Sequence, residues 1–290
     1  MARTPADESL PADPRKRFYV SDLDGTLLDE CGQLSDDSVC RINRLIERGL
    51  NFTIATARNY DSAYPLLHGL NLRHPVILFN GVYLTELHTG ENVFFSDFIS
   101  KDVIDNMMDM VRPRGIDPFI YTYGEKHRVY YRNATNPGAQ AYIDSLDGDG
   151  RLQKVREYVF DADERISGFL LIDTHTALEP VYNKLQTRYT DDLNIYFAKD
   201  VSNTGFHWLQ SFHPEANKGR MLKRMAQHLD ISLEETVVFG DYLNDLDMFE
   251  VAGRAIAVAN ALPEVRSAAH EVIASNTEQG VIAYLESLFD

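Results

Sequence analysis

The apolar segment 18–21 runs directly into Asp22 and Asp24, and this arrangement constrains the fold more than any other part of the sequence. A short apolar run that ends in a turn, here supplied by Gly25, is typical of a buried strand. Two carboxylates held together at a strand end repel each other, so either one is protonated or a cation neutralises them. The segment therefore predicts a strand whose carboxyl end lies beside a cation.

A second segment repeats this design far along the chain. Residues 237–239 are apolar and are followed by Gly240 and then by the spaced acids Asp241 and Asp245. Two such strand ends side by side would gather several carboxylates, and Mg²⁺ prefers oxygen ligands of this kind. Together, the two segments predict a Mg²⁺ pocket between two strand ends.

Short, continuous apolar runs recur along the chain, as in strands that are buried on both faces of a parallel sheet. They lie at residues 18–21, 52–55, 76–79, 237–239 and 255–258. Helical patterns alternate with these runs, between Ser35 and Gly49 and at residues 218–229 and 244–252. This alternation predicts a doubly wound α/β fold with a parallel sheet, in which ligands bind at the carboxyl ends of the strands.

The middle of the chain predicts an inserted α+β cap domain at residues 88–211. Strand-like patterns lie at residues 93–98, 118–123, 127–131, 168–173, 193–198 and 206–211, and helical patterns at 101–112, 137–146 and 175–189. The flanking parts, residues 17–87 and 212–290, would then form one Rossmann-like catalytic core. Residues 1–16 are rich in proline, alanine and charge, and we expect a flexible tail there.

Charge and cysteine content narrow the classes of function. The 44 acidic and 28 basic residues give a formal net charge of −16, which argues against nonspecific binding to nucleic acid or to an anionic membrane. Cys31 and Cys40 give neither a disulfide framework nor metal-ligand spacing. No apolar run resembles the core of a signal peptide or reaches the length of a membrane span. We therefore expect a cytoplasmic enzyme without a nucleic-acid or membrane partner.

The paired acids Asp22 and Asp24 suit phosphoryl transfer through an aspartate. A carboxylate beside Mg²⁺ can attack phosphorus and form an aspartyl phosphate that water then cleaves, and we assign this role to Asp22. Asp24 suits general acid and base work, because it can protonate the leaving alcohol and then take a proton from the attacking water. The plainer alternative for either residue is an ordinary turn or N-cap aspartate.

Two other positions offer groups that stabilise a phosphate. Thr56 follows the strand-like segment 52–55, and its hydroxyl is expected to donate to a phosphate oxygen. Lys218 begins a predicted helix and is expected to place its charge against both Asp22 and the transferring phosphoryl group.

The predicted metal site takes in residues of the second acidic segment. Asp241 completes the site, since Mg²⁺ keeps several waters and needs few protein oxygens. Asp245 is expected one helical turn further on, as a water-mediated ligand or a supporting group, and Asn244 is expected to orient the two acids.

With these motifs in this order, the chain resembles the haloacid dehalogenase (HAD) superfamily of phosphatases. The motifs are Asp22-Leu23-Asp24-Gly25-Thr26, residues 52–58, Asn217-Lys218-Gly219 and residues 237–245. The sequences Ala259-Asn260-Ala261 and Glu278-Gln279-Gly280-Val281 are most similar to the Cof-type branch with its large α/β cap. The resemblance covers nearly the whole chain after about residue 16. It implies that Arg58, Asn80 and Asn217 bind substrate and that the backbone carbonyl of Asp24 binds the metal.

Three functions fit these motifs. The first is a Mg²⁺-dependent phosphatase of small phosphorylated metabolites, such as sugar phosphates or phosphorylated cofactors. The second is a phosphosugar mutase on the same scaffold, in which a sugar rather than water meets the aspartyl phosphate. The third is a phospho-receiver signalling module, which Asp24 and the inserted domain disfavour, because a receiver has no leaving alcohol to protonate. Substrate choice is expected to depend on residues 88–211, since every catalytic motif falls outside that segment.

Overall fold

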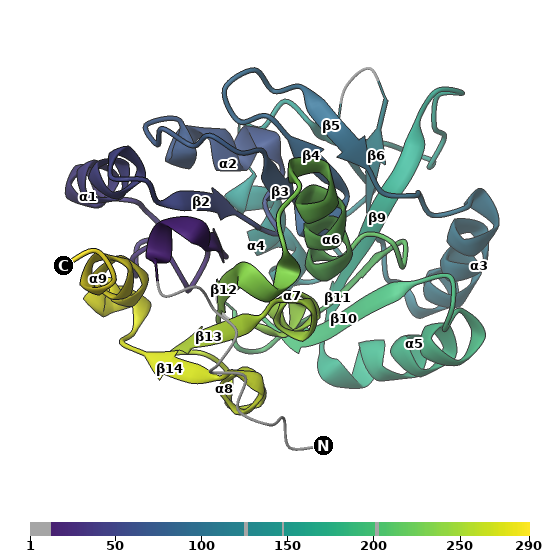
Figure 1. Cartoon of the computed structure of the whole chain (residues 1–290). Helices are drawn as coiled ribbons and strands as arrows, with labels where there is room; N and C mark the ends of the chain where they lie inside the picture. The colour runs from purple at the N-terminus through teal and green to yellow at the C-terminus, as the bar shows by residue number, and fades with distance from the viewer. Residues whose placement is uncertain (1–12, 125–126, 147, 201–202) are drawn as a thin grey trace. The chain divides into compact units, whose positions relative to one another are not determined.

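The computed structural model describes residues 13–124, 127–146, 148–200 and 203–290, which form two compact units. The first unit takes in the chain up to Ser96 and from Glu215 to Asp290, and the second comprises Asp97–Pro214 (Figure 1). Of the predicted flexible tail, residues 1–12 lie outside the described residues, and Pro14–Lys16 form a 3-10 turn that Asp13 caps. Within the described parts of the chain, no helix combines the length and the apolar character needed to cross a bilayer.

A five-stranded parallel sheet forms the centre of the first unit, with the strand order β14-β13-β12-β1-β2. These strands are β1 (Phe18–Ser21), β2 (Asn51–Ile54), β12 (Thr236–Gly240), β13 (Arg254–Val258) and β14 (Glu271–Ile273). Every residue of β1 and β12 is buried, as the continuous apolar runs predicted. Because Ser21 aligns with Phe239, the acids that follow the two strands emerge at one edge of the sheet.

Helices of the first unit bury apolar faces, and α1, α2 and α6 each begin at a polar side-chain cap. They are α1 (Asp36–Glu47), α2 (Tyr60–Leu67), α6 (Lys218–Leu229), α7 (Leu246–Val251), α8 (Pro263–Ala268) and α9 (Gly280–Ser287), with 3-10 turns at Leu233–Glu235, Leu243–Asp245 and Asn276–Glu278. The Ser35 hydroxyl caps α1 by accepting from the Ser38 amide. Helix α6 buries Met221, Leu222 and Met225 and lies against α7. The predicted alternation of strands and helices is confirmed.

The predicted strand 76–79 was expected in the parallel sheet but belongs to a separate, smaller sheet. Strand β3 (Val76–Leu78) forms a three-stranded antiparallel sheet with β4 (Tyr83–Thr85) and β5 (Asn92–Phe95). A parallel bridge between Ala55 and Ile77 joins β3 to the chain just after β2. The chain reverses after β3 in the 3-10 turn Phe79–Gly81, where all three residues have positive φ, and this reversal makes the antiparallel pairing possible.

The second unit contains a six-stranded sheet with the order β10-β11-β9-β6-β7-β8. Its strands are β6 (Phe119–Tyr123), β7 (Arg128–Tyr131), β8 (Leu152–Lys154), β9 (Arg165–Asp173), β10 (Asn194–Lys199) and β11 (His207–Phe212), and all pairs are antiparallel except β7 with β8. Its helices are α3 (Lys101–Val111), α4 (Pro137–Ser145) and α5 (His175–Arg188), with a 3-10 turn at Arg112–Arg114. The predicted fold class, a parallel α/β core with an α+β insertion, is confirmed.

Glycine at position 168 permits close packing in the centre of this antiparallel sheet. Gly168 lies on β9, and a Cβ atom there would come within 2.8 Å of the Ser211 carbonyl oxygen and 2.9 Å of the Phe212 ring. Neither neighbour is able to yield freely, because both belong to the adjacent strand β11.

Gly168→Ala is therefore expected to destabilise the protein by about 1–3 kcal/mol, the usual effect of overpacking a core. Urea unfolding followed by fluorescence checks this, since the single tryptophan, Trp208, lies on β11. Gly205→Ala is the matched control, because a Cβ at Gly205 would meet nothing within 4 Å. Equal unfolding midpoints for the two variants would contradict the packing argument.

Candidate active site

Asp22 is held at the carboxyl edge of the parallel sheet by the sheet's own hydrogen bonds. It follows β1 directly, and its amide donates to the Phe239 carbonyl of β12 at 3.0 Å. The hydrogen bonds between β1 and β12 thus continue one residue past β1 and fix the backbone from which the Asp22 side chain extends. Asp22 is 5% exposed, so its carboxylate is largely removed from water.

A buried lysine lies between two of the predicted acids. Lys218 Nζ donates to Asp22 Oδ1 and to Asp245 Oδ1, each at 2.6 Å, and the side chains of Lys218 and Asp245 have no exposed surface. Lys218 is the first residue of α6, and Gly219 beside it lets the helix approach α7, since a Cβ there would lie 2.1 Å from the Asp247 carbonyl oxygen. The close approach of two helices therefore places the ammonium group at the sheet edge.

Asp241 is positioned by its neighbours in two motifs. The Asp245 carboxylate accepts hydrogen bonds from the amides of Asp241 at 2.8 Å and Tyr242 at 3.0 Å, which shapes the loop after β12. The Thr26 hydroxyl donates to Asp241 Oδ1 at 2.7 Å. Gly25 has φ +76°, and a Cβ there would lie 2.4 Å from Asp241 Oδ2, so only glycine fits this turn.

The electrostatics of this cluster show an excess of negative charge. Burial raises the pKa of Asp22 well above its usual value; the Lys218 charge opposes this rise, and the charges of Asp245 and Asp241 add to it. Burial and the Asp245 charge raise the pKa of Asp241 to about 7. Burial lowers the pKa of Lys218, but the charges of Asp22 and Asp245 outweigh burial and raise it overall. One ammonium group thus faces three carboxylates and does not neutralise them.

The donor set of the cluster fits a divalent cation such as Mg²⁺. Asp22, Asp241 and Asp245 each offer an oxygen, and these oxygens lie within 4.8 Å of one another. Carboxylate oxygens are ligands that Mg²⁺ prefers. Lys218 and backbone amides donate to both oxygens of Asp245. By contrast, Lys218 donates to one oxygen of Asp22, and Thr26 donates to one oxygen of Asp241. The arrangement favours Asp22 and Asp241 as direct ligands and Asp245 as their support.

Asn244 and Asn80 link the metal-side loop to the loop after β3. Asn244 Nδ2 donates to Asn80 Oδ1 at 2.7 Å, and the Asn80 amide donates to the Thr56 carbonyl at 3.0 Å. Asn244 Oδ1 is buried and accepts no hydrogen bond from the described residues. This unpaired acceptor suits a metal-bound water.

The remaining predicted residues lie around the cluster in different roles. Thr56 is buried, and its hydroxyl oxygen accepts from the Arg58 amide at 3.1 Å, which leaves its O–H able to donate. The carboxylate of Asp24 does not join the three acids but pairs with Arg58. Asn217 caps α6 by accepting from the Arg220 amide at 2.7 Å, so its side-chain oxygen has a structural partner.

Asn260 and Asn276, to which the sequence analysis assigned no role, position the turn after β1. Asn260 Nδ2 donates to the Gly25 carbonyl at 2.7 Å, and Asn260 Oδ1 accepts from the Asn276 amide at 3.1 Å. Asn276 Nδ2 in turn donates to the Leu28 carbonyl at 2.9 Å. These amides fix the turn that carries Asp24. The sequence signal for Asn260 was its place just after a predicted strand, at the same sheet edge.

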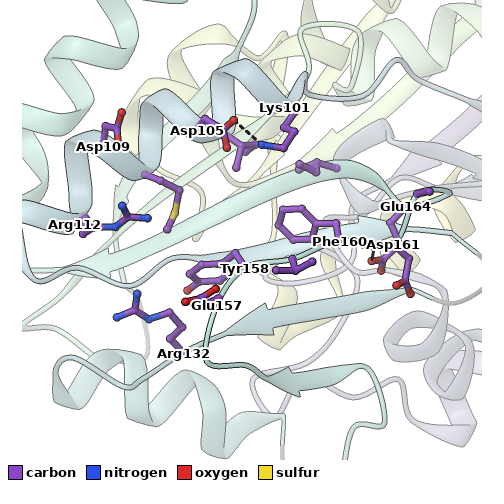
Figure 2. A pocket seen from close by; sticks show the side chains of 15 residues that line it. Lys101, Asp105, Asp109, Arg112, Arg132, Glu157, Tyr158, Phe160, Asp161 and Glu164 are labelled. Carbon is purple, nitrogen blue, oxygen red and sulfur yellow. Dashed lines mark hydrogen bonds and ion pairs between the residues drawn. The ribbon is translucent and has the colours of Figure 1, made fainter.

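A hollow of about 930 Å³ lies elsewhere, within the second unit between α3 and residues 157–164 (Figure 2). Lys101 and Asp105 at its rim pair at 2.6 Å, and the largely buried Glu164 accepts from the hydroxyls of Tyr130 and Thr122. In the described residues, no lining side chain has a buried polar atom without a partner. The hollow contains none of the predicted site residues, so the candidate site rests on the first unit.

Comparisons with known proteins identify the family of this chain and its fold. The family model described as haloacid dehalogenase-like hydrolase matches residues 19–285. The 5-amino-6-(5-phospho-D-ribitylamino)uracil phosphatase YitU of Bacillus subtilis is 24% identical over 278 residues, which is 92% of this chain and 96% of the relative. The HMP-PP phosphatase of Cronobacter sakazakii is 24% identical over 281 residues, or 94% of this chain and 96% of the relative. A haloacid dehalogenase-like hydrolase from Bacteroides thetaiotaomicron has the same fold, with a TM-score of 0.77, 22% identity and coverage of 94% of this chain and 99% of its own.

We expect the stability of the chelator-treated protein to fall as the pH rises through the range in which Asp241 titrates. The pKa of Asp241 is 3.8 ordinarily and about 7 in the folded protein, so the folded state binds more protons than the unfolded state between these values. The resulting stabilisation of the folded protein is complete below pH 3.8 and is lost as the pH rises to about 7. The difference in free energy of unfolding between the wild type and Asp241→Asn isolates this contribution.

Mg²⁺ is expected to counteract that loss. At a hundred times its dissociation constant, a ligand that binds only the folded state adds about 2.7 kcal/mol of stability. Thermal unfolding at pH 7 with and without Mg²⁺ measures the effect, which should be much smaller in Asp241→Asn. A Mg²⁺ response unchanged by this substitution would contradict the metal site, as would a pH-independent difference between the two proteins.

Proposed function

Because this chain belongs to the haloacid dehalogenase-like hydrolase family, we propose that it is a Mg²⁺-dependent phosphatase of small phosphorylated metabolites that works through an aspartyl phosphate. The observation that carries the proposal is the buried carboxylate of Asp22, 2.6 Å from the Lys218 ammonium at the edge of a parallel sheet. With the charges of Lys218 and of a bound Mg²⁺ beside it, this buried carboxylate would be ionised and suited to attack phosphorus.

Asp22 is the nucleophile in this proposal. One of its oxygens forms a bond to phosphorus as the bond between phosphorus and the leaving alcohol breaks. Lys218 holds the Asp22 carboxylate in place and offers positive charge to the phosphoryl oxygens, while the Thr56 hydroxyl donates to one of them. When bound by Asp22 and Asp241, Mg²⁺ would neutralise charge that develops on the phosphoryl group.

Asp24 is the general acid and base. Its carboxyl proton passes to the leaving oxygen during the first step, and the resulting carboxylate takes a proton from the water that attacks the aspartyl phosphate. Each cycle therefore returns Asp24 to its protonated form and Asp22 to a free carboxylate, with alcohol and inorganic phosphate as products.

The relatives support a small phosphorylated substrate. One is named for a phosphorylated ribitylaminouracil and another for HMP-PP, and this chain covers nearly the whole length of both. We propose the same class of substrate for this chain, but neither of these two compounds in particular. The two free thiols, Cys31 and Cys40, support placing the enzyme in a reducing cytoplasm.

Phosphate release from a panel of phosphorylated metabolites is expected to require Mg²⁺ and to cease with a chelator. Asp22→Asn should lower turnover by a factor of about 10⁴ or more, as is usual when a nucleophile is lost, because the amide keeps the shape but not the nucleophilicity of the carboxylate. Circular dichroism checks that the variant remains folded. Full turnover in metal-free buffer, or in Asp22→Asn, would refute the assignment.

Asp24→Asn is expected to separate the two chemical steps. With p-nitrophenyl phosphate the leaving group needs no proton, so the first step proceeds while the second is slow and the phosphoenzyme accumulates. Mass spectrometry of the quenched protein should find one phosphoryl group on the peptide that carries Asp22. Absence of this adduct, with nitrophenol release intact, would contradict the division of roles.

A further inference from the structure

The hollow between α3 and residues 157–164 combines an apolar floor with a charged rim (Figure 2). Ile104, Met108 and Ile166 line it and belong to the hydrophobic core of the second unit. Its volume of about 930 Å³ lies within the range of pockets that hold small molecules. The chemistry of its lining decides which kind of occupant it suits.

The buried polar groups that line the hollow already have partners within the second unit. The Tyr158 hydroxyl donates to the Pro118 carbonyl at 2.6 Å, and the Glu164 carboxylate accepts from the Asp161 amide at 2.9 Å. Small-molecule sites orient their ligands through converging polar groups. In the described residues, no buried polar atom of the lining remains for that purpose. The hollow therefore suits an apolar side chain of a protein better than a polar metabolite.

A projecting apolar side chain lies beside this floor. Val159 lines the same hollow and is 72% exposed, and no other large apolar side chain of the described residues is as exposed; the next is Val272 at 49%. A single exposed valine is common on protein surfaces, but Val159 extends the apolar area of the hollow. One surface thus carries both an apolar projection and an apolar hollow.

The rim of the hollow also carries charges of both signs. Asp109 and Arg112 lie at the end of α3, and Glu157 lies on the facing segment (Figure 2). All three are exposed, and none of them forms an ion pair with another residue that the structure describes. This surface therefore offers a cation and carboxylates that are available to a partner.

A contact between two identical copies requires this combination. In a two-fold symmetric contact the same surface faces itself, so each projection must meet a hollow and each cation an anion within that one surface. An unrelated partner would require only one member of each pair on this chain. The formal net charge of −16 makes two copies repel each other overall, so their attraction has to come from a local surface of this kind.

We propose that two copies of this chain associate through the hollow of the second unit. Val159 of each copy enters the hollow of the other, and Arg112 of each faces acidic groups on the other's rim. Fifteen residues line the hollow, and a stable interface takes about 20–30 residues a side, so the lining supplies at least half of one. This association does not depend on the proposed phosphatase chemistry.

Sedimentation velocity over a range of protein concentrations measures the association directly. The chain has a mass of 33.0 kDa, and a dimer of twice that mass is expected to predominate as the concentration rises. A single chain's mass at every concentration up to about 100 µM would overturn the proposal, because a stable specific interface associates well below that concentration.

Val159→Asp is expected to raise the dissociation constant of the dimer by about 100-fold or more. The substitution removes buried apolar surface at two symmetric places and puts a charge into each hollow. Val272→Asp is the matched control, since it puts the same charge on the other exposed valine, on β14 of the first unit. Its dissociation constant should stay within about twofold of the wild type, as for an ordinary surface substitution.

Arg112→Glu tests the charges of the rim. It replaces attraction by repulsion twice in a two-fold contact, so the dissociation constant should rise by about 10-fold. Arg73→Glu is the matched control, because Arg73 is exposed on the first unit and likewise forms no ion pair with another described residue. Both variants change the net charge of a copy equally, so overall repulsion would affect them equally.

Circular dichroism checks that the four variants remain folded. A dimer that Val159→Asp leaves intact, or that both valine variants weaken equally, would overturn the assignment of this surface, as would equal weakening by the two arginine variants. The substituted residues lie outside the proposed catalytic residues. Loss of Mg²⁺-dependent phosphate release in the wild type would therefore count against the proposed function alone, and loss of the dimer against the association alone.

Discussion

The fully buried ammonium group of Lys218, bonded to both Asp22 and Asp245, is the interaction on which the site depends. It joins three segments that are far apart in the sequence: the end of β1, the start of α6 and the loop after β12. Burying charges is costly, and losing one member of such a group leaves the others uncompensated. The sheet register and the close approach of α6 to α7 are therefore constrained by the need to keep these charges together.

The balance of charge also explains the polar neighbours of the cluster. Three carboxylates exceed one ammonium, and burial raises the pKa of Asp22 and Asp241. Backbone amides and the Thr26 hydroxyl stabilise the acids in part, and a divalent cation would supply the remaining positive charge. Gly25 permits this crowding, because any side chain there would collide with Asp241.

The sequence predicted the elements and the sheet edge well, because strand ends with acidic turns are local patterns. The parallel α/β core, the α+β insertion and the hydrolase class are confirmed, and Asp22, Lys218, Asp241 and Asp245 do come together. The pairing of β3 was not predictable, since it depends on the positive φ values of residues 79–81. The Arg58–Asp24 pair and the capping role of Asn217 depend on side-chain rotamers, which periodicity does not report.

The central claim is that the acidic edge of the parallel sheet binds the catalytic divalent cation. Anomalous X-ray scattering from crystals grown with Mn²⁺ in place of Mg²⁺ tests it most directly. The account predicts one strong peak at about 2.0–2.2 Å from carboxylate oxygens of both Asp22 and Asp241, the distance typical of small hard cations with oxygen ligands. A strong peak elsewhere, with no peak between these two residues, would contradict it.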